Sequence, residues 1–228
     1  ANEIIKIDQD TFMSPKTLEA AKIGVGCLVD AIDNVLEKKY RTAFCLLRPP
    51  GHHAEREKAM GFCFFSTIGI GAKYLKKIKQ LYKIAIVDFD VHHGNGTQDV
   101  LWNDPDCLFI SIHQDKIFPF TGSKNETGIK NNILNIPVNA GSNSTEFRSI
   151  VDNIIIPRLI KFEPEFLLIS AGFDGHQDDQ ISQTQWAESD FIYITKKLKS
   201  FANQFCEDRI VSCLEGGYHL EMLSTCCV

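Results

Sequence analysis

The sequence predicts an α/β protein built on a mostly parallel, doubly wound sheet. The first observation is that short apolar runs alternate with longer segments of helical periodicity, the pattern of repeated β-α-β units. The second is that nearly every cluster of unusual polar residues follows directly on an apolar run. In open α/β sheets the carboxyl ends of the strands are where ligands bind, so this placement supports the same fold class.

The predicted elements follow from periodicity and from glycine and proline breaks. Residues 1–15 look irregular, and apolar residues at helical spacing then predict a long helix that packs on the sheet. Residues 114–131 form a loop too long and polar for a simple connection, as expected near an active site. The predicted elements, in order, are a helix at 16–39, a strand at 42–47, a helix at 66–80, a strand that opens at Ile84, a helix near 97–102, strands at 107–113 and 132–138, a helix at 145–162, a strand at 166–170, a helix at 187–207 and a strand at 209–214.

Composition is consistent with one large domain over residues 1–228. Hydrophobic residues make up 44% and charged residues 23% of the chain, which is ordinary for a globular protein. A formal net charge of -5 gives no reason to expect direct nucleic-acid binding, and no signal peptide or apolar run of membrane length is visible. The 8 cysteines form no Cys-x-x-Cys pair, so we expect free thiols in a reducing, intracellular compartment.

The stretch from Ile84 to Gly96 carries the strongest functional signal. It opens as an apolar run typical of a buried parallel strand and then breaks into acids, imidazoles and glycines. Alternation along a strand would place Asp88, Asp90 and His92 on one face. Burying these groups would be costly unless a cation compensates them, so we expect a divalent metal. The alternative is an ordinary strand-to-helix turn, in which Asp and Gly serve the backbone.

Three further polar clusters follow predicted strands and should meet at the same edge of the sheet. Asp90, His92 and Asp174 would give a three-ligand site with an open position, the arrangement of a catalytic metal. Two carboxylates make this a hard site, so Zn²⁺ is favoured while Fe²⁺ and Co²⁺ stay open. The alternative for Asp174 is a turn aspartate between glycines.

The pair His52-His53 is a candidate general base and acid. Asp88 could hold His52 and Asn95 could hold His53, each through the far ring nitrogen. Because a carboxylate raises imidazole basicity more than an amide does, the two histidines would differ in protonation. A single histidine at this position would more often be a surface loop residue.

Aromatic residues near glycines complete the predicted site. Tyr218, which follows Gly216 and Gly217, could donate its hydroxyl to a carbonyl oxygen whose negative charge grows during attack by water. A tyrosine packed at a helix start is the alternative. Phe62 and Phe118 could form the walls of a narrow apolar channel, although loop phenylalanines are more often core residues.

Five motifs together resemble the zinc-dependent histone deacetylases. They occur in the order and spacing of that family and span nearly the whole chain. The Arg-Pro-Pro-Gly-His-His segment and Asn95 make the resemblance closest to class II members. The motifs are Arg-Pro-Pro-Gly-His-His-Ala (48–54), Gly-Phe-Cys (61–63), Asp-Phe-Asp-Val-His-His-Gly-Asn-Gly (88–96), Ser-Ala-Gly-Phe-Asp (170–174) and Glu-Gly-Gly-Tyr (215–218).

The resemblance implies the arginase-deacetylase fold, with a parallel sheet between two helical layers. It implies hydrolysis of acetyl-lysine in histone tails or other proteins, with His53 as general base and acid. It also implies chromatin-linked partners such as corepressor subunits, and a location in the nucleus or the cytoplasm. The residues that it implicates are Asp90, His92 and Asp174 for zinc; Asp88, Asp90, His92 and Ser111 for a potassium ion; His52, His53, Asp88, Asn95 and Tyr218 for catalysis; and Gly61, Phe62, Phe118, Ile181, Gly216 and Gly217 for substrate binding.

Two departures from the family pattern are visible. The family has further segments before the region that matches Ala1 and after the region that matches Val228, so we expect a domain truncated at both ends. Phe120 stands where the family loop usually has glycine, which predicts an altered channel mouth.

Other functions remain open at this point. An acetylpolyamine amidohydrolase would share the site but use an acidic gatekeeper where this chain has Ile181. The apolar residue favours a peptide substrate, while Asp178 and Asp179 keep the polyamine possible. A catalytically inactive binding module would usually lack a ligand or the tyrosine, and this chain has all of them. An arginase-type dinuclear site would need more ligands than these clusters offer.

Overall fold

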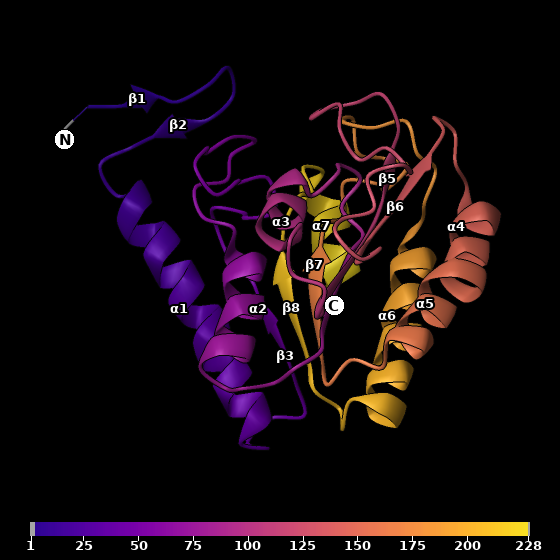
Figure 1. The fold of residues 1–228 in the computed structure, drawn as a ribbon. Coiled ribbons are helices and arrows are strands. Elements are labelled where there is room, and N and C mark those ends of the chain that lie inside the picture. The colour runs from indigo at the N-terminus through magenta and orange to yellow at the C-terminus, as the bar shows by residue number, and fades with distance from the viewer. Residues whose placement is uncertain (1–2, 228) are drawn as a thin grey trace.

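The structure, a computed structural model that describes residues 3–227, is centred on a parallel sheet of six strands (Figure 1). The strand order is β3-β8-β7-β4-β5-β6, and every neighbouring pair is parallel. The predicted parallel α/β sheet is therefore confirmed. The strands are β3 (Thr42–Cys45), β4 (Ile84–Asp88), β5 (Cys107–Gln114), β6 (Ile133–Val138), β7 (Phe166–Ala171) and β8 (Ile210–Leu214).

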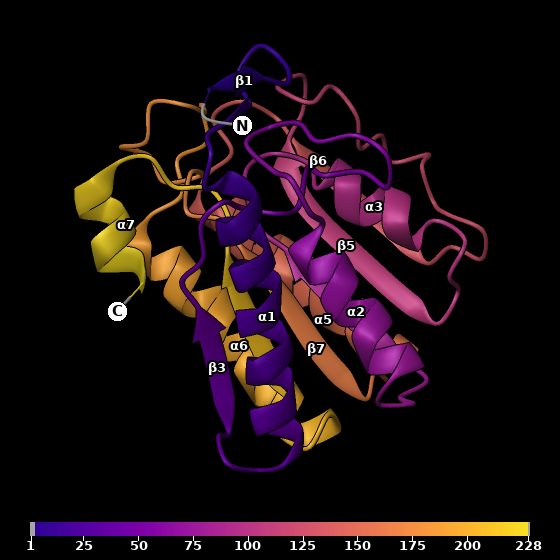
Figure 2. The ribbon, with the colours of Figure 1, turned by 90° about the vertical axis from the view of Figure 1, so that its left-hand side faces the viewer.

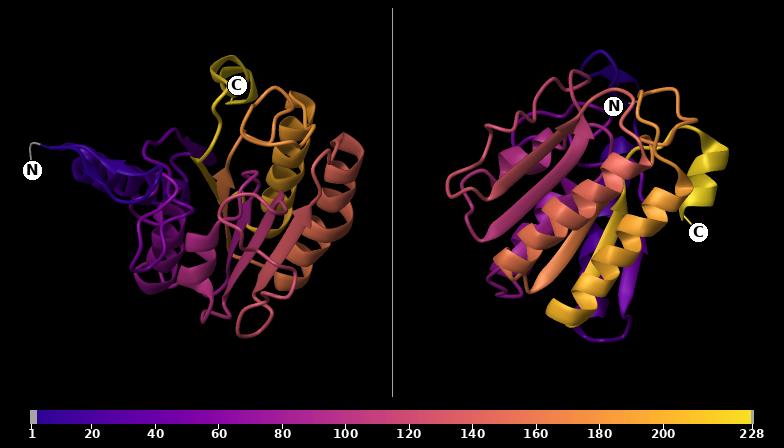
Figure 3. Two further views of the ribbon diagram at one scale, coloured as in Figure 1. Left: turned by 90° about the horizontal axis from the view of Figure 1, so that it is seen from above. Right: turned by 90° about the vertical axis from the view of Figure 1, so that its right-hand side faces the viewer.

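Helices cover both faces of this sheet, which makes three layers (Figures 2 and 3). One layer holds α1 (Thr17–Leu36), α2 (Thr67–Lys77) and α3 (Asn95–Leu101), and the other holds α4 (Ser144–Ile150), α5 (Ile156–Phe162) and α6 (Glu188–Phe205). The first four positions of β4 are apolar because both faces of the strand are buried: Ile84 and Ile86 join one core, while Ala85 and Val87 join the other.

The order of the strands reverses at β4, and this places the functional edge. From β4 the chain moves outward through β5 and β6, then returns to pair β7 with the other side of β4. Such a switch point opens a crevice beyond the carboxyl ends of the two central strands. The polar segments after β4 and β7 both lie at this crevice.

Three parts of the structure differ from the sequence prediction. The predicted helix at 145–162 is interrupted by a π-helical turn (Val151–Ile155) just before Pro157, whose ring nitrogen has no hydrogen to donate to the preceding turn. A short hairpin of β1 (Ile5–Lys6) and β2 (Phe12–Met13), and a last helix α7 (Leu220–Cys227), were not predicted. Both lack a buried face, so no periodic apolar pattern marks them.

Strand β4 also ends earlier than the alternation of polar residues suggested. It stops at Asp88, and the next residues turn through side-chain bonds to the main chain. The Asp90 N–H donates to Asp88 Oδ1 at 3.1 Å, and the His92 N–H donates to Asp90 Oδ1 at 2.9 Å. Asp88, Asp90 and His92 are thus brought together by successive turns rather than by one strand face.

No helix in residues 3–227 is both long enough and apolar enough to span a membrane. The eight cysteines are all free thiols.

Candidate active site

Asp90, His92 and Asp174 converge beyond the ends of β4 and β7. Their ligand atoms all lie within 4.8 Å of one another, and all three side chains are buried. His92 Nδ1 lies 2.9 Å from Asp174 Oδ2 and 3.1 Å from Asp90 Oδ1. One imidazole nitrogen and two carboxylate oxygens therefore point at a common centre.

Each carboxylate of this cluster is oriented by a main-chain donor. The Val91 N–H donates to Asp174 Oδ1 at 2.9 Å, and the Gly216 N–H donates to Asp90 Oδ2 at 2.7 Å. A Cβ added at Gly216 would lie 2.3 Å from Asp174 Oδ2, so only glycine lets the main chain approach this closely. Asp174 Oδ2 and Asp90 Oδ1 are the oxygens that lie beside His92 Nδ1 at the shared centre, and Asp90 Oδ1 also accepts the His92 N–H.

A cation would stabilise the buried negative charges at this centre. Burial raises the pKa of Asp174 to about 6. Burial by itself lowers the pKa of His92, but the Asp174 and Asp90 carboxylates outweigh it and raise that pKa to about 10. An imidazolium would thus form here in the absence of any other positive charge. Two carboxylates, one imidazole and this electrostatic demand fit a divalent metal ion with an open coordination position.

The two neighbouring histidines are held by different partners. His52 Nδ1 lies 3.0 Å from Asp88 Oδ2, and His53 Nδ1 lies 2.8 Å from Asn95 Oδ1. The two rings are adjacent, with centroids 4.0 Å apart. Both pairings were expected from the sequence, and the structure brings all four residues together.

The surroundings of the two rings give them different protonation states. Burial lowers the pKa of His52, but the Asp90 and Asp88 carboxylates more than offset it and hold the pKa well above its usual range. For His53, burial and then the neighbouring His52 hold the pKa well below its usual range. His53 is therefore neutral at pH 7. Since its Nδ1–H donates to the Asn95 amide oxygen, its Nε2 carries the free lone pair.

Tyr218 reaches the site from the loop between β8 and α7. It follows Gly216 and Gly217, and the latter has φ +139°, which favours glycine. Burial, and then the charges of Asp174 and Asp90, raise the pKa of the Tyr218 hydroxyl well above its usual value. The hydroxyl therefore remains a proton-bearing hydrogen-bond donor.

A cavity of about 240 Å³ leads to these groups. A Cβ at Gly61 would lie 2.5 Å from His53 Cδ2, so the chain needs glycine there. Phe62 has φ +66°, and its N–H donates to the buried Thr11 hydroxyl at 3.0 Å. The cavity, here named the channel, is lined by Asp10, His53, Gly61, Phe62, His92, Ile117, Phe118, Ile181 and Tyr218.

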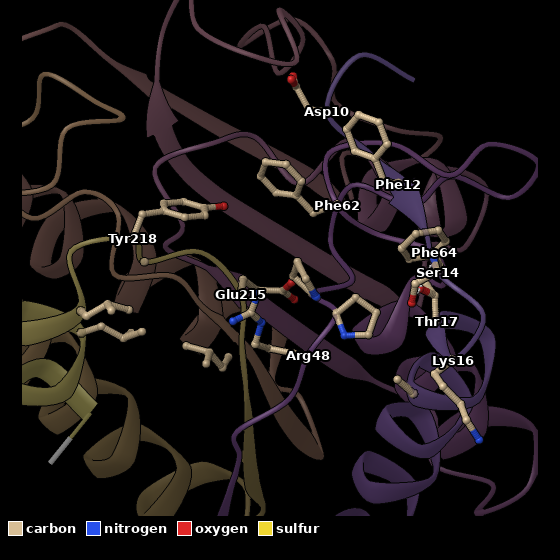
Figure 4. Close-up of a pocket in the computed structure, with 17 residues that line it drawn as sticks. Asp10, Phe12, Ser14, Lys16, Thr17, Arg48, Phe62, Phe64, Glu215 and Tyr218 are labelled. Carbon is tan, nitrogen blue, oxygen red and sulfur yellow. Dashed lines mark hydrogen bonds between the residues drawn. The ribbon is translucent and has the colours of Figure 1, made fainter. Parts of the chain in front are cut away.

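A larger cavity of about 630 Å³ adjoins the channel (Figure 4). Tyr218, Phe62 and Asp10 line both spaces, and Arg48 and Glu215 also line the larger one. Glu215 is buried and fixes the main chain at His52, because its Oε2 accepts the N–H groups of Gly51 at 2.7 Å and of His52 at 3.1 Å.

Several residues of this site were not singled out from the sequence. Glu215 stood out only as part of a motif, and its position directly after a strand was the available signal. Asp10 and Thr11 lie in the hairpin that looked irregular, so nothing in the sequence pointed to them. Asp179 was expected only as a possible ligand for a cationic substrate, whereas its carboxylate accepts main-chain N–H groups.

Other predicted residues have mixed outcomes. Ser111 pairs in register with Asp88, but its hydroxyl contacts His113 Nδ1 at 2.8 Å. Ile181 lies at the rim of the channel and is 40% exposed. Phe120 has φ +64° and is 78% exposed, and it is not among the residues that line the channel. The altered channel mouth stays a prediction.

Comparison with known proteins gives consistent matches. A family model described as "Histone deacetylase domain" matches residues 1–228. Type-2 histone deacetylase 2 of Dictyostelium discoideum is 41% identical over 228 residues, which covers 93% of this chain and 13% of that protein. Histone deacetylase 14, chloroplastic, of Arabidopsis thaliana is 37% identical and covers 94% of this chain and 53% of that protein. A probable deacetylase of Archaeoglobus fulgidus is 36% identical, and the match covers 94% of this chain and 60% of that protein.

The fold has a match among solved structures as well. The crystal structure of the HDA15 HD domain superimposes with a TM-score of 0.91 at 28% identity, covering 98% of this chain and 66% of that chain. This chain spans less than two thirds of the length of each of the three relatives named above.

Proposed function

The chain belongs to the histone deacetylase family, and on this premise we propose that it hydrolyses the acetyl amide of N6-acetyl-lysine in histone tails or other proteins. The observation that carries the proposal is the meeting, at one channel, of a three-ligand metal centre, a neutral histidine and a protonated tyrosine. These are the parts needed for metal-assisted attack of water on an amide.

Asp90, His92 and Asp174 would hold the metal, and we propose zinc. When bound, zinc supplies Lewis-acid chemistry, polarising the amide carbonyl and making water more acidic. We also propose a potassium ion near Asp88 and Ser111, which are neighbours on β4 and β5. What supports it is the buried Asp88 carboxylate, whose pKa burial raises to about 7 and whose negative charge a cation would stabilise.

His53 would act as general base and then as general acid. Its Nε2 would accept a proton from the attacking water, so that the new C–O bond forms at the acetyl carbon. The same nitrogen would then deliver that proton to the lysine nitrogen as the C–N bond breaks. Acetate and the free amine would leave. His52, kept protonated beside Asp88, would keep the adjoining ring neutral through its positive charge.

Tyr218 would stabilise the charge that develops on the acetyl oxygen. Its hydroxyl is a donor throughout the neutral range because its pKa is raised. Phe62 and Phe118 would hold the lysine methylenes between their rings, and the His53 and Phe118 rings already meet edge to face with centroids 5.0 Å apart. Asp10 at the mouth would offer an acceptor to donor groups on the flanking substrate.

The rim disfavours a small polycation as substrate. Ile181 is apolar, and the Asp179 carboxylate is already used by three main-chain N–H groups. Asp10 and Asp178, by contrast, are exposed. This arrangement supports a protein substrate over an acetylated polyamine.

The deciding experiment measures acetate release by the full-length protein from an acetyl-lysine peptide and from an N-acetylated polyamine, with and without zinc. We expect zinc-dependent turnover that is faster with the peptide. Faster polyamine turnover would make the protein an acetylpolyamine amidohydrolase. If neither substrate reacts while zinc is bound, the proposed activity is wrong and a binding role takes its place.

A further inference from the structure

Asp179 connects two segments of the rim through its carboxylate. It lies in the loop between β7 and α6 and is only 5% exposed. Its Oδ2 accepts the N–H of Tyr218 at 2.7 Å and that of His219 at 3.0 Å, and its Oδ1 accepts the N–H of Ile181 at 3.2 Å. Within residues 3–227 no basic side chain forms an ion pair with it, so main-chain donors stabilise its charge.

The loop that carries Tyr218 needs such an anchor. Gly217 gives its backbone wide conformational freedom, and Tyr218 as a whole residue is 44% exposed, although its hydroxyl end is desolvated. Among the described residues the Tyr218 hydroxyl has no hydrogen-bond partner, so no bond at the far end of the side chain fixes it. Before Gly217 the loop is fixed by the bond from the Gly216 N–H to Asp90; after Gly217 it is fixed by Asp179.

We propose that Asp179 is a positioning residue that sets the place of the Tyr218 hydroxyl at the acetyl oxygen. The hydroxyl lies at the far end of a long side chain, so a small rotation of the main chain at Tyr218 moves it a large distance. A misplacement of about 1 Å can cost on the order of 10² in rate. This inference rests on the proposed function, which gives Tyr218 its role as oxyanion donor.

The location of Asp179 at the start of α7 further stabilises its carboxylate. The His219 carbonyl accepts the Leu223 N–H at 2.8 Å, so α7 starts directly at the two N–H groups that Asp179 holds. A carboxylate at the positive end of a helix is electrostatically favoured. Because the other oxygen holds Ile181, one side chain fixes two residues of the channel, Ile181 and Tyr218.

A double-mutant cycle tests this role. Asp179→Ala should lower kcat about 10- to 100-fold when Tyr218 is present. In the Tyr218→Phe background the same change should cost less than about threefold, because there is no hydroxyl left to misplace. Asp179→Asn keeps one oxygen that can accept from Tyr218 and His219, so it should retain most of the activity. Equal losses in both backgrounds, or no loss with Tyr218 present, would overturn the proposal.

A matched control separates positioning from general stability. Asn143 caps α4 in the same manner, accepting the N–H groups of Thr145 at 3.0 Å and Glu146 at 3.2 Å. Asn143→Ala should lower the melting temperature without changing kcat. If Asp179→Ala does not fold, Asp179→Ser carries the same cycle, since its shorter side chain cannot reach both donors.

Amide hydrogen exchange gives a readout that needs no activity. Asp179→Ala should speed exchange across residues 216–223 while leaving β4 protected. Unchanged exchange in 216–223 would refute the anchor even in an active enzyme. If the wild-type protein hydrolyses neither acetyl substrate, the proposed function fails, and faster exchange would still establish Asp179 as the anchor of the loop.

Discussion

At the scale of single residues, the chemistry depends on what each ring nitrogen faces. Asn95 gives His53 an amide oxygen, and its own Nδ2 donates to Glu55 Oε1 at 2.8 Å, which fixes the amide orientation. The amide holds the imidazole without adding charge. Burial and the neighbouring His52 keep the pKa of His53 below its ordinary value, as a base at neutral pH requires.

This arrangement makes Asn95→Asp a test of the base. The wild-type kcat/KM should be retained as pH falls through 6.5 and should drop only below it, when His53 becomes protonated. A carboxylate at position 95, next to His53 and close to Glu55, should raise that pKa, so the acid limb should move to higher pH by about 1 unit. The pH profile of kcat/KM measures this. Asn153→Asp, at an exposed asparagine, should leave the profile unchanged, whereas an unmoved limb in Asn95→Asp would rule out His53 as the base.

Tyr218 is tested by removal of a single oxygen. Tyr218→Phe should lower kcat by roughly 10²–10³, the range for losing one oxyanion donor. Metal content and melting temperature should not change, since the hydroxyl has no hydrogen-bond partner in residues 3–227. Tyr82→Phe, at a tyrosine that is 77% exposed, is the matched control and should retain full activity. A Tyr218→Phe enzyme with normal turnover would remove this residue from the mechanism.

At the scale of elements, the loop between β5 and β6 carries backbone strain. Phe120 has φ +64°, a region that costs a residue with a Cβ about 1–2 kcal/mol. Its side chain is mostly exposed, so packing offers little compensation. Phe118, two residues earlier, contacts His53 and forms part of the channel wall. The strain therefore lies next to a functional wall, where such conformations are often found.

Phe120→Gly should accordingly stabilise the fold. Glycine relieves the strain in the folded state, but it also gives the unfolded chain more conformational entropy. The net effect should be an increase of about 0.5–1 kcal/mol in the free energy of unfolding. For a chain of this length that corresponds to about 2 °C in melting temperature. Phe120→Ala is the control, because its Cβ retains the unfavourable φ. Equal melting temperatures for the two variants would show that the loop is not strained.

At the scale of the whole molecule, the buried acids at the carboxyl edge of the sheet link metal binding to stability. Asp88, Asp90 and Asp174 are fully buried beside one another, so the fold tolerates them best when a cation is present. A ligand that binds only the folded state stabilises it by mass action. The metal should therefore act as a structural component as well as a catalytic one.

Chelation should lower the melting temperature, and added zinc should restore it. A hydroxamate should raise the melting temperature of the metal-loaded protein further. At a concentration of 100 times its Kd, it should add about 2.7 kcal/mol to the free energy of unfolding. Asp174→Asn should bind less zinc by elemental analysis, while Asp178→Asn, which changes an exposed neighbour, should bind the normal amount. Full zinc occupancy in Asp174→Asn would contradict the proposed ligand set.

The pattern of residues was enough to predict the fold class and most of the chemical groups of the site. Apolar runs such as Ile84–Val87 predicted buried parallel strands, because a strand covered on both faces has no polar side. Asp90, His92 and Asp174 could be named together because parallel strands end at one edge. The five motifs indicated the family as well, because their residues, order and spacing are distinctive in combination.

The contacts that hold these groups in place could be seen only in the folded chain. The sequence could not show that turns, rather than one strand face, bring Asp88 and Asp90 together. Nor could it show that Glu215 supports the histidines or that Asp179 anchors Tyr218. Such contacts join residues far apart in the chain, 39 positions for the bond between Asp179 and Tyr218. Local patterns report burial and periodicity, whereas the partner of a buried carboxylate depends on how distant loops pack against each other.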